Sequence, residues 1–336
     1  MPKSENPICE TSVIVPCYNE EKTICKLLEA IYQQSYPREL LEVIISDAQS
    51  EDLTREMISK FSKENPDLEI RIIDNSERTI PAAVNRGVES ARGIYIVRLD
   101  AHSVPDENYI AYSIQLLKEK KAENVGGVWE IAPGNDSCMA LAIARAAGHP
   151  IGAGDAKYRI SNKAGYVETV PFGAFKKETF LRIGKFNEQM LANEDYEFNT
   201  RIRLENGKIW FDPKIRSIYY ARSTLNALVK QYWRYGYWKF QMLKKYPGSI
   251  RWRQALPPLF VLTIILLSAF SFFLLIPRII LALLIGMYYL VLIISSVIEA
   301  ARSQELCFLN MIFVFNCIHF FWGSGFLFSI IKGPKK

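Results

Sequence analysis

The chain has 336 residues, of which 49% are hydrophobic, and a formal net charge of +6 at pH 7. The excess positive charge lies near the C-terminus, where seven basic and two acidic residues occur from Arg251 onward, against 34 basic and 33 acidic residues before it. This distribution does not suggest a nucleic-acid partner, and the length allows one large domain plus an appendage or two modest domains.

The six cysteines form no CxxC pair and have no spacing typical of a disulfide framework. We therefore expect reduced, structural cysteines in a cytosolic environment. The first ten residues, MPKSENPICE, lack the apolar core of a secretory signal. This composition predicts that the N-terminal part of the chain stays in the cytosol.

Four apolar runs in the first hundred residues predict strands, each followed by a polar loop, at 11–16, 41–46, 69–74 and 95–100. Helices are expected after the first three loops, and this alternation is typical of a parallel α/β sheet. Ligands bind beyond the carboxyl ends of such strands. We therefore place a nucleotide-like ligand at the edge that holds Asn19, Asp47, Arg78 and Asp100. No GxGxxG motif occurs in the sequence, which argues against a dinucleotide-dependent dehydrogenase.

The fourth run ends abruptly in Asp100, Ala101 and His102, and Pro105 follows. In extended geometry, residues i and i+2 point to the same side, so Asp100 and His102 would face one divalent cation. A mixed oxygen and nitrogen pair suits Mn²⁺ better than Mg²⁺. A polar strand exit without any metal is the alternative, because Asp and Pro are common turn residues.

Two helices are predicted further along the chain. The first opens at 192–201 with acids in its first turn, which either only favour the helix dipole or provide a general base at a cleft. The second, at 225–246, is amphipathic and dense in aromatic and basic side chains. That mixture suits a membrane interface, where rings lie at headgroup level and long cations reach outward.

Three apolar runs, 256–276, 279–298 and 307–331, have the ~20 residues that a bilayer crossing needs. Basic residues before the first run predict a cytosolic location for the domain that precedes it. Three crossings would put the C-terminal lysines outside, against the same tendency. The first two runs could instead form a hairpin that does not fully cross, and Gly323-Ser324-Gly325 could break the third. His319 in this run is either functional or a packed, hydrogen-bonded side chain.

Seven motifs occur in the order VIVPCYNEE, DAQSED, RTIPAAVNRG, RLDAHSVP, PFGAF, NEDYEFNTR and QYWRYG. Together they resemble the family 2 glycosyltransferases of the GT-A fold, most of all the membrane-attached branch typified by succinoglycan-type exopolysaccharide enzymes. The resemblance implies a GT-A domain at 1–250, which is α/β and Rossmann-like with a mostly parallel sheet. Residues 251–336 would form C-terminal transmembrane helices.

The resemblance also implies a role for each matching residue. Asp195 would be the general base of catalysis. Asp47 would hydrogen-bond the nucleobase of the donor, for which uracil is favoured. Asp100 would bind the ribose and help to hold the metal, and His102 stands where a second metal-binding aspartate is usual. The other donor-binding residues that it implies are Pro16, Tyr18, Asn19, Glu20, Arg78, Gln231 and Arg234. Tyr235 replaces the usual tryptophan of the Gln-x-x-Arg-Trp motif, which leaves its stacking role open.

The expected function is an inverting, metal-dependent glycosyltransferase in the cell membrane with a cytosolic catalytic domain. It would move a sugar from a nucleotide sugar, with a UDP-sugar favoured, to a lipid-linked or growing saccharide acceptor, and one base with direct displacement implies inversion. A membrane-anchored nucleotide sensor or scaffold without turnover is the alternative from another class. A polyprenyl-phosphate glycosyltransferase and a polysaccharide synthase are nearer variants. The sequence leaves open which sugar is moved and whether the protein forms a homo-oligomer.

Overall fold

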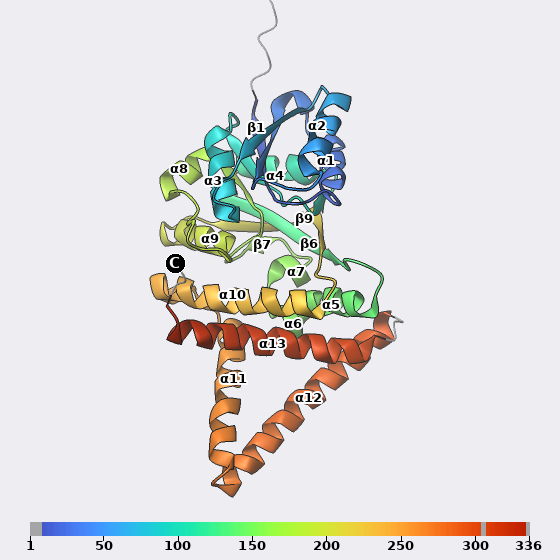
Figure 1. The fold of residues 1–336 in the computed structure, drawn as a ribbon. Helices are drawn as coiled ribbons and strands as arrows, with labels where there is room; N and C mark the ends of the chain where they lie inside the picture. The colour runs from blue at the N-terminus through green and yellow to red at the C-terminus, as the bar shows by residue number, and fades with distance from the viewer. Residues whose placement is uncertain (1–8, 304–306, 334–336) are drawn as a thin grey trace, which may run out of the picture. The chain divides into compact units, whose positions relative to one another are not determined.

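The computed structural model describes residues 9–303 and 307–333 (Figure 1). They form two compact units. The first contains the chain up to Glu130 together with Lys157–Tyr219, and the second contains Ile131–Ala156 together with the chain from Tyr220 onward. The second unit therefore includes residues 220–250, which the sequence analysis assigns to the first domain.

A mixed sheet forms the centre of the first unit, with nine strands among the described residues. The strand order is β3-β2-β1-β4-β8-β6-β9-β5, and β7 pairs with β9. The bounds are Thr11–Cys17 for β1, Leu41–Asp47 for β2, Glu69–Asp74 for β3, Tyr95–Arg98 for β4, Ser103–Pro105 for β5, Asn124–Ala132 for β6, Gly165–Tyr166 for β7, Ala174–Lys176 for β8 and Ile209–Tyr220 for β9. Strands β3, β2, β1 and β4 are parallel, whereas β8 is antiparallel to β4 and to β6.

Helices cover both faces of the parallel strands, because the strand residues alternate between two apolar cores. Val13 and Val15 of β1 belong to the core that α1, α2 and α4 complete, and Ile14 belongs to the core of α3, α8 and α9. The helix bounds are Ile24–Tyr32 for α1, Thr54–Glu64 for α2, Ile80–Ser90 for α3, Tyr109–Lys118 for α4, Lys157–Ile160 for α7, Lys177–Ile183 for α8 and Glu194–Leu204 for α9. The predicted parallel α/β half is thus confirmed.

The second unit is helical, with α5 at Cys138–Gly148, α6 at Pro150–Ala153, α10 at Leu225–Lys245, α11 at Trp252–Ser271, α12 at Leu275–Ser303 and α13 at Phe308–Ile331. Helix α10 confirms the helix predicted at 225–246. Within the described ranges, three helices, α11, α12 and α13, are long and apolar enough to cross a membrane. The idea that Gly323-Ser324-Gly325 breaks the third apolar run is wrong, because α13 continues through these residues.

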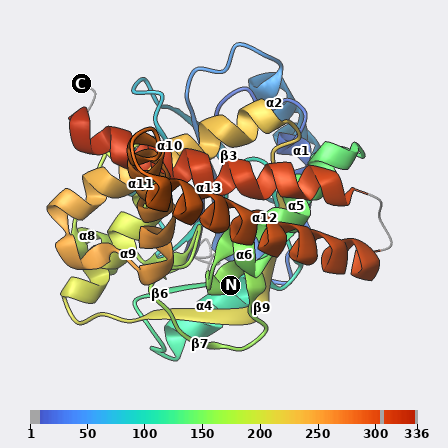
Figure 2. The same ribbon diagram turned by 90° about the horizontal axis from the view of Figure 1, so that it is seen from below.

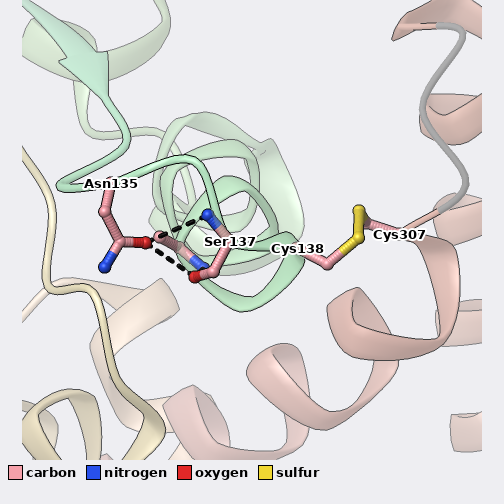
Figure 3. Close-up of a disulfide and its surroundings, with 5 residues drawn as sticks. Asn135, Ser137, Cys138 and Cys307 are labelled. Atoms are coloured by element: carbon pink, nitrogen blue, oxygen red, sulfur yellow. Dashed lines mark hydrogen bonds between the residues drawn. A yellow bond between two sulfur atoms is a disulfide. The ribbon is translucent and has the colours of Figure 1, made fainter.

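A disulfide joins Cys138, at the start of α5, to Cys307, just before α13 (Figure 3). Ser137 fixes the start of α5, since its hydroxyl accepts a hydrogen bond from the Ala140 N–H at 3.2 Å and donates one to Asn135 at 2.7 Å. The expectation of uniformly reduced cysteines is therefore wrong for this pair. The two residues are 169 positions apart in the sequence, so no local spacing of cysteines predicts the disulfide.

We expect four of the six cysteines to react with maleimide when the full-length protein is denatured without reductant. These are the free thiols of Cys9, Cys17, Cys25 and Cys317. Prior reduction should raise the number of adducts to six, and a Cys307→Ser variant should show five in either condition. The mass of the labelled protein measures each number. Six adducts on the unreduced parent would contradict the disulfide.

Candidate functional site

The loops after β1, β2 and β3 each contain a residue other than glycine in the left-handed region. These residues are Asn19 with φ 52°, Gln49 with φ 61° and Arg78 with φ 54°. Such conformations are uncommon for side-chain-bearing residues and gather where function imposes the backbone path. The carboxyl edge of the parallel strands, where the sequence places a nucleotide, is therefore shaped by three strained loops.

The loop after β1 is held by the loop after β2 through reciprocal hydrogen bonds. The Asn19 N–H donates to Ser50 Oγ at 2.8 Å, and Asn19 Oδ1 accepts from the Glu51 N–H at 2.9 Å. The Glu20 N–H donates to Thr54 Oγ1 at 2.8 Å. Pro16, one of the predicted donor-binding residues, lies in β1 opposite Ser46. The two loops thus form one ordered rim.

Asp47 is fully buried beneath this rim and organises it. Its carboxylate accepts hydrogen bonds from the Ser50 N–H at 3.0 Å, from Ser50 Oγ at 2.5 Å and from Arg55 Nε at 2.5 Å. In the loop after β1, the ring of Tyr18 is 46% exposed, and the guanidinium carbon of Arg78, from the loop after β3, lies 5.8 Å from the centre of that ring. An exposed ring beside a cation suits a planar base and its phosphates.

Asp100 and His102 lie in the turn between β4 and β5, since β4 ends at Arg98. The Ser103 N–H closes this turn by donating to the Asp100 carbonyl at 2.9 Å. The prediction that the two side chains share a face of an extended strand is therefore wrong. Both still belong to the carboxyl edge, because His102 Nδ1 lies 3.1 Å from Glu20 Oε1 in the loop after β1.

The residues of this turn fit a divalent cation shared with a substrate. Among the described residues, no three His, Cys, Asp or Glu side chains form a metal cluster by themselves. A carboxylate and an imidazole could instead complete their coordination with phosphate oxygens, as hard cations require. The contact between Glu20 and His102 is typical of metal-binding histidines, whose ring is oriented by a carboxylate on the other nitrogen.

Arg98, which the sequence analysis does not single out, lies at the centre of three carboxylates. Its side chain is 2% exposed. Nη2 donates to Asp100 Oδ1 at 3.2 Å and to Glu194 Oε1 at 3.0 Å, while Nη1 donates to Asp195 Oδ1. Arg98 therefore links the end of β4 to the first turn of α9. Through it, the predicted metal ligand Asp100 is connected to the predicted general base Asp195.

Asp195 receives a second hydrogen bond from a strained backbone. The Phe172 N–H donates to Asp195 Oδ2 at 3.3 Å, and Phe172 has φ 62°, which is rare for a bulky residue. Gly173 follows with φ 65°, where an added Cβ would lie 2.5 Å from Asn124 Oδ1. Strain of about 1–3 kcal/mol is held here by the surrounding packing, which points to a functional constraint.

The electrostatic environment of Asp195 suits a proton acceptor. Burial raises the pKa of its carboxyl to about 7, an effect that Arg98 opposes and that the charges of Glu194 and Asp100 reinforce. The side chain remains 21% exposed, so the carboxylate is within reach of a ligand. A carboxylate with a pKa near neutrality acts well as a general base.

Gln231 and Arg234 lie on α10, in the second unit. Gln231 Nε2 donates to the hydroxyl of Tyr235 at 3.0 Å, one helical turn away. The substituted aromatic residue of the motif thus contacts Gln231 directly. The other predicted site residues, from Pro16 to Asp195, all belong to the first unit.

Comparison with known proteins relates most of the chain to one family. The model described as "Glycosyl transferase family 2" matches residues 12–183. A relative from Methanococcus voltae, named dolichyl N-acetyl-alpha-D-glucosaminyl phosphate 3-beta-D-2,3-diacetamido-2,3-dideoxy-beta-D-glucuronosyltransferase, is 28% identical over 332 residues, 96% of this chain and 97% of the relative. The succinoglycan biosynthesis protein ExoA of Rhizobium meliloti is 29% identical over 258 residues, 76% of this chain and 77% of the relative.

Among solved structures, the mannosyltransferase PcManGT from Pyrobaculum calidifontis, in complex with GDP-Man and Mn²⁺, resembles this chain with a TM-score of 0.65. The match covers 95% of this chain and 87% of that one at 19% sequence identity, so it speaks to the fold alone. It confirms the predicted fold class, a GT-A-type α/β domain followed by apolar C-terminal helices.

Proposed function

Because the chain belongs to glycosyl transferase family 2, we propose that it transfers a sugar, with inversion, from a nucleotide sugar to a lipid-linked or growing saccharide acceptor. The observation that carries this proposal is the carboxylate of Asp195. It is held between Arg98 and the Phe172 amide, its pKa lies near 7, and it shares Arg98 with Asp100 at the edge of the sheet.

In the proposed reaction, Asp195 removes the proton from an acceptor hydroxyl while the oxygen attacks the anomeric carbon. The bond from that carbon to the nucleotide diphosphate breaks, and the diphosphate leaves with the electron pair. A single direct displacement inverts the configuration of the anomeric carbon. General-base assistance of this kind typically contributes ~10²–10⁴-fold to the rate.

Asp100 and His102 would hold a divalent cation, and Mn²⁺ suits them better than Mg²⁺. When bound, the cation would neutralise charge on the leaving diphosphate. PcManGT, whose structure holds GDP-Man and Mn²⁺, supports a divalent cation in this fold. Glu20 would keep the His102 ring in the orientation that ligation needs.

The strained rim would hold the donor, which we propose to be a UDP-sugar. Tyr18, Asn19 and Arg78 would line the nucleotide, and Asp47 would bond its base either directly or through the rim that it organises. Gln231 and Arg234 would meet the diphosphate or the acceptor end. The dolichyl phosphate in the name of the Methanococcus voltae relative supports a lipid-linked acceptor, and a polyprenyl phosphate is the nearest variant.

The test is the release of free nucleotide diphosphate by full-length protein in the presence of membrane lipid extract. A panel of UDP- and GDP-sugars should contain one donor that is consumed with Mn²⁺ and not after chelation. Asp100→Ala should abolish this turnover. Asp67→Ala is the matched control, because Asp67 forms an ion pair with the exposed Arg38 and precedes β3, at the opposite end of that strand from the carboxyl edge. If donors bind but none is consumed by the parent, the protein is a sensor or scaffold.

A further inference from the structure

We propose that the chain crosses the bilayer twice, through α11 and α12, and that α13 lies in the membrane surface beside α10. The sequence leaves the number of crossings open, because three apolar runs are present and three crossings conflict with the charge of the C-terminus. The proposal concerns how the second unit meets lipid and does not depend on the reaction that the first unit performs.

Helix α10 is too highly charged to enter the hydrocarbon core of a bilayer. It carries cations along its length, at Lys230, Arg234, Lys239, Lys244 and Lys245. Each would cost about 2.5–3.5 kcal/mol at the centre of a membrane helix. Even the buried Lys239 satisfies its ammonium group locally, by donating to the Ser249 carbonyl at 3.0 Å. A helix of this composition stays at the surface.

Helix α13 packs along α10 at both of its ends, so the two helices share one orientation (Figure 1). Near the start of both helices, Leu228 and Tyr232 of α10 share an apolar cluster with residues of α13 between Met311 and Ile318. Near the other end, Gln241 Nε2 donates to Ser329 Oγ at 2.7 Å. A partner held in this way along a surface helix cannot also cross the bilayer.

Glycines bring the backbones of α10 and α13 into direct contact. A Cβ at Gly236 would lie 1.9 Å from the Trp322 carbonyl oxygen, and a Cβ at Gly325 would lie 2.2 Å from the Trp233 carbonyl oxygen. Small residues at such positions allow close helix packing. Of the two glycines expected to break α13, Gly325 therefore forms its contact with α10, whereas Gly323 contacts α11, where an added Cβ would lie 2.5 Å from the Pro257 carbonyl oxygen.

The middle of α13 also touches parts of the chain that do not span a membrane. His319 Nε2 lies 2.8 Å from the carbonyl oxygen of Ile151 in α6, which means that this nitrogen carries the proton. On its other side, Nδ1 accepts from the hydroxyl of Tyr288, in the spanning helix α12, at 3.0 Å. His319 is thus a packed, hydrogen-bonded residue, which is one of the two alternatives predicted from the sequence. If α13 crossed the bilayer, it would carry α6 and its neighbour α5, with Arg145, into the hydrocarbon.

Helices α11 and α12 differ from α13 in their exposure. Only 11% of the most apolar window of each is buried within the protein, against 39% for α13. Figure 2 shows α11 nearly end-on, while α13 and the oblique α12 both run across the view. The 20 residues of α11 extend about 30 Å at 1.5 Å per residue, which matches the hydrocarbon core. Trp252, 68% exposed at its start, suits the interface.

Two crossings also resolve the conflict of charges. Lys332, the last basic residue that the structure describes, would return to the side that holds Lys244, Lys245 and Arg251. The short link 272–274 would lie on the opposite side of the membrane, where Arg278 is the nearby charged residue. The exposed apolar residues of α13, such as Leu309, Phe313 and Ile330, would rest on the lipid surface.

The test labels intact cells that produce the full-length chain with a membrane-impermeant maleimide. Phe273→Cys places a thiol in the link, at a side chain that is 84% exposed, and Gly333→Cys places one after α13, where an added Cβ meets no atom within 4 Å. The parent chain, with its own thiols, is the control. We expect intact cells to label Phe273→Cys above the parent, and Gly333→Cys to gain label only after permeabilisation.

Two outcomes would overturn the proposal. Label gained by both variants in intact cells would mean three crossings. Label gained by neither before permeabilisation would mean that the α11–α12 hairpin does not cross. Turnover of nucleotide sugar is measured on the same two variants. Labelling tests the topology and turnover tests the reaction, so the failure of one proposal is distinguished from the failure of the other.

Discussion

Replacing Arg98 by methionine should abolish turnover and destabilise the first unit by about 3–5 kcal/mol, the typical cost of removing one partner from a buried ion pair. The substitution leaves Asp100, Glu194 and Asp195 close together without the cation that they share. Thermal unfolding of the full-length protein, followed alongside release of nucleotide diphosphate, measures both effects. Arg38→Met is the matched control, because both side chains of the Arg38–Asp67 pair are exposed and such pairs contribute little to stability.

Arg98→Lys separates a positioning role from a purely structural one. Lysine keeps the positive charge, but a single ammonium cannot reproduce the fork that reaches three carboxylates from two nitrogens. We expect a folded protein with normal donor affinity and a lower kcat, because Asp195 loses its fixed place relative to Asp100. A lysine variant with the kcat of the parent, or a methionine variant that unfolds like the parent, would show that Arg98 does not organise the site.

The parallel half of the fold was predictable because each of its strands is a largely apolar run followed by a polar loop. Val13-Ile14-Val15 illustrates this, since residues buried on both faces leave no alternation to misread. Most of the antiparallel half gave no such signal. Strands β5, β7 and β8 have three residues or fewer, too few to establish a period, and they are strands only through pairing with β9 or β4.

The site was predictable wherever a residue belongs to a motif and not where tertiary contact creates its role. Arg98 reads in the sequence as an interruption of an apolar strand, and only the fold brings Glu194 and Asp195 to it. Phe172 likewise gives no sign of a positive φ, because bulky residues rarely adopt one. Asp100 and His102 belong to the expected edge, but they lie in a turn between two strands and not in an extended strand, because tertiary contacts end β4 at Arg98.

Replacing Asp195 by asparagine should lower kcat by about 10²–10⁴-fold and leave donor binding in place. Asparagine has the same shape, keeps an oxygen for the Phe172 amide and has no basic carboxylate. The kcat of the parent should also depend on pH. Since the pKa of Asp195 is raised to about 7, the reactive carboxylate is lost as pH falls through 7, and kcat should drop about tenfold per unit below it. Turnover from pH 5.5 to 9 at saturating donor and Mn²⁺ measures the profile.

Glu194→Gln is the sharper comparison, because Glu194 shares the same guanidinium and its charge helps to raise the pKa of Asp195. Its removal should therefore move the midpoint of the pH profile downward, whereas Asp195→Asn should remove the midpoint altogether. Stability should respond in the opposite sense to activity. The buried carboxylate costs more in the folded protein than in the unfolded chain, so the stability of the parent relative to Asp195→Asn should fall as pH rises from about 4 to about 7. A parent profile that is flat between pH 5.5 and 9, or a loss of kcat in Glu194→Gln as large as in Asp195→Asn, would assign the base to another group.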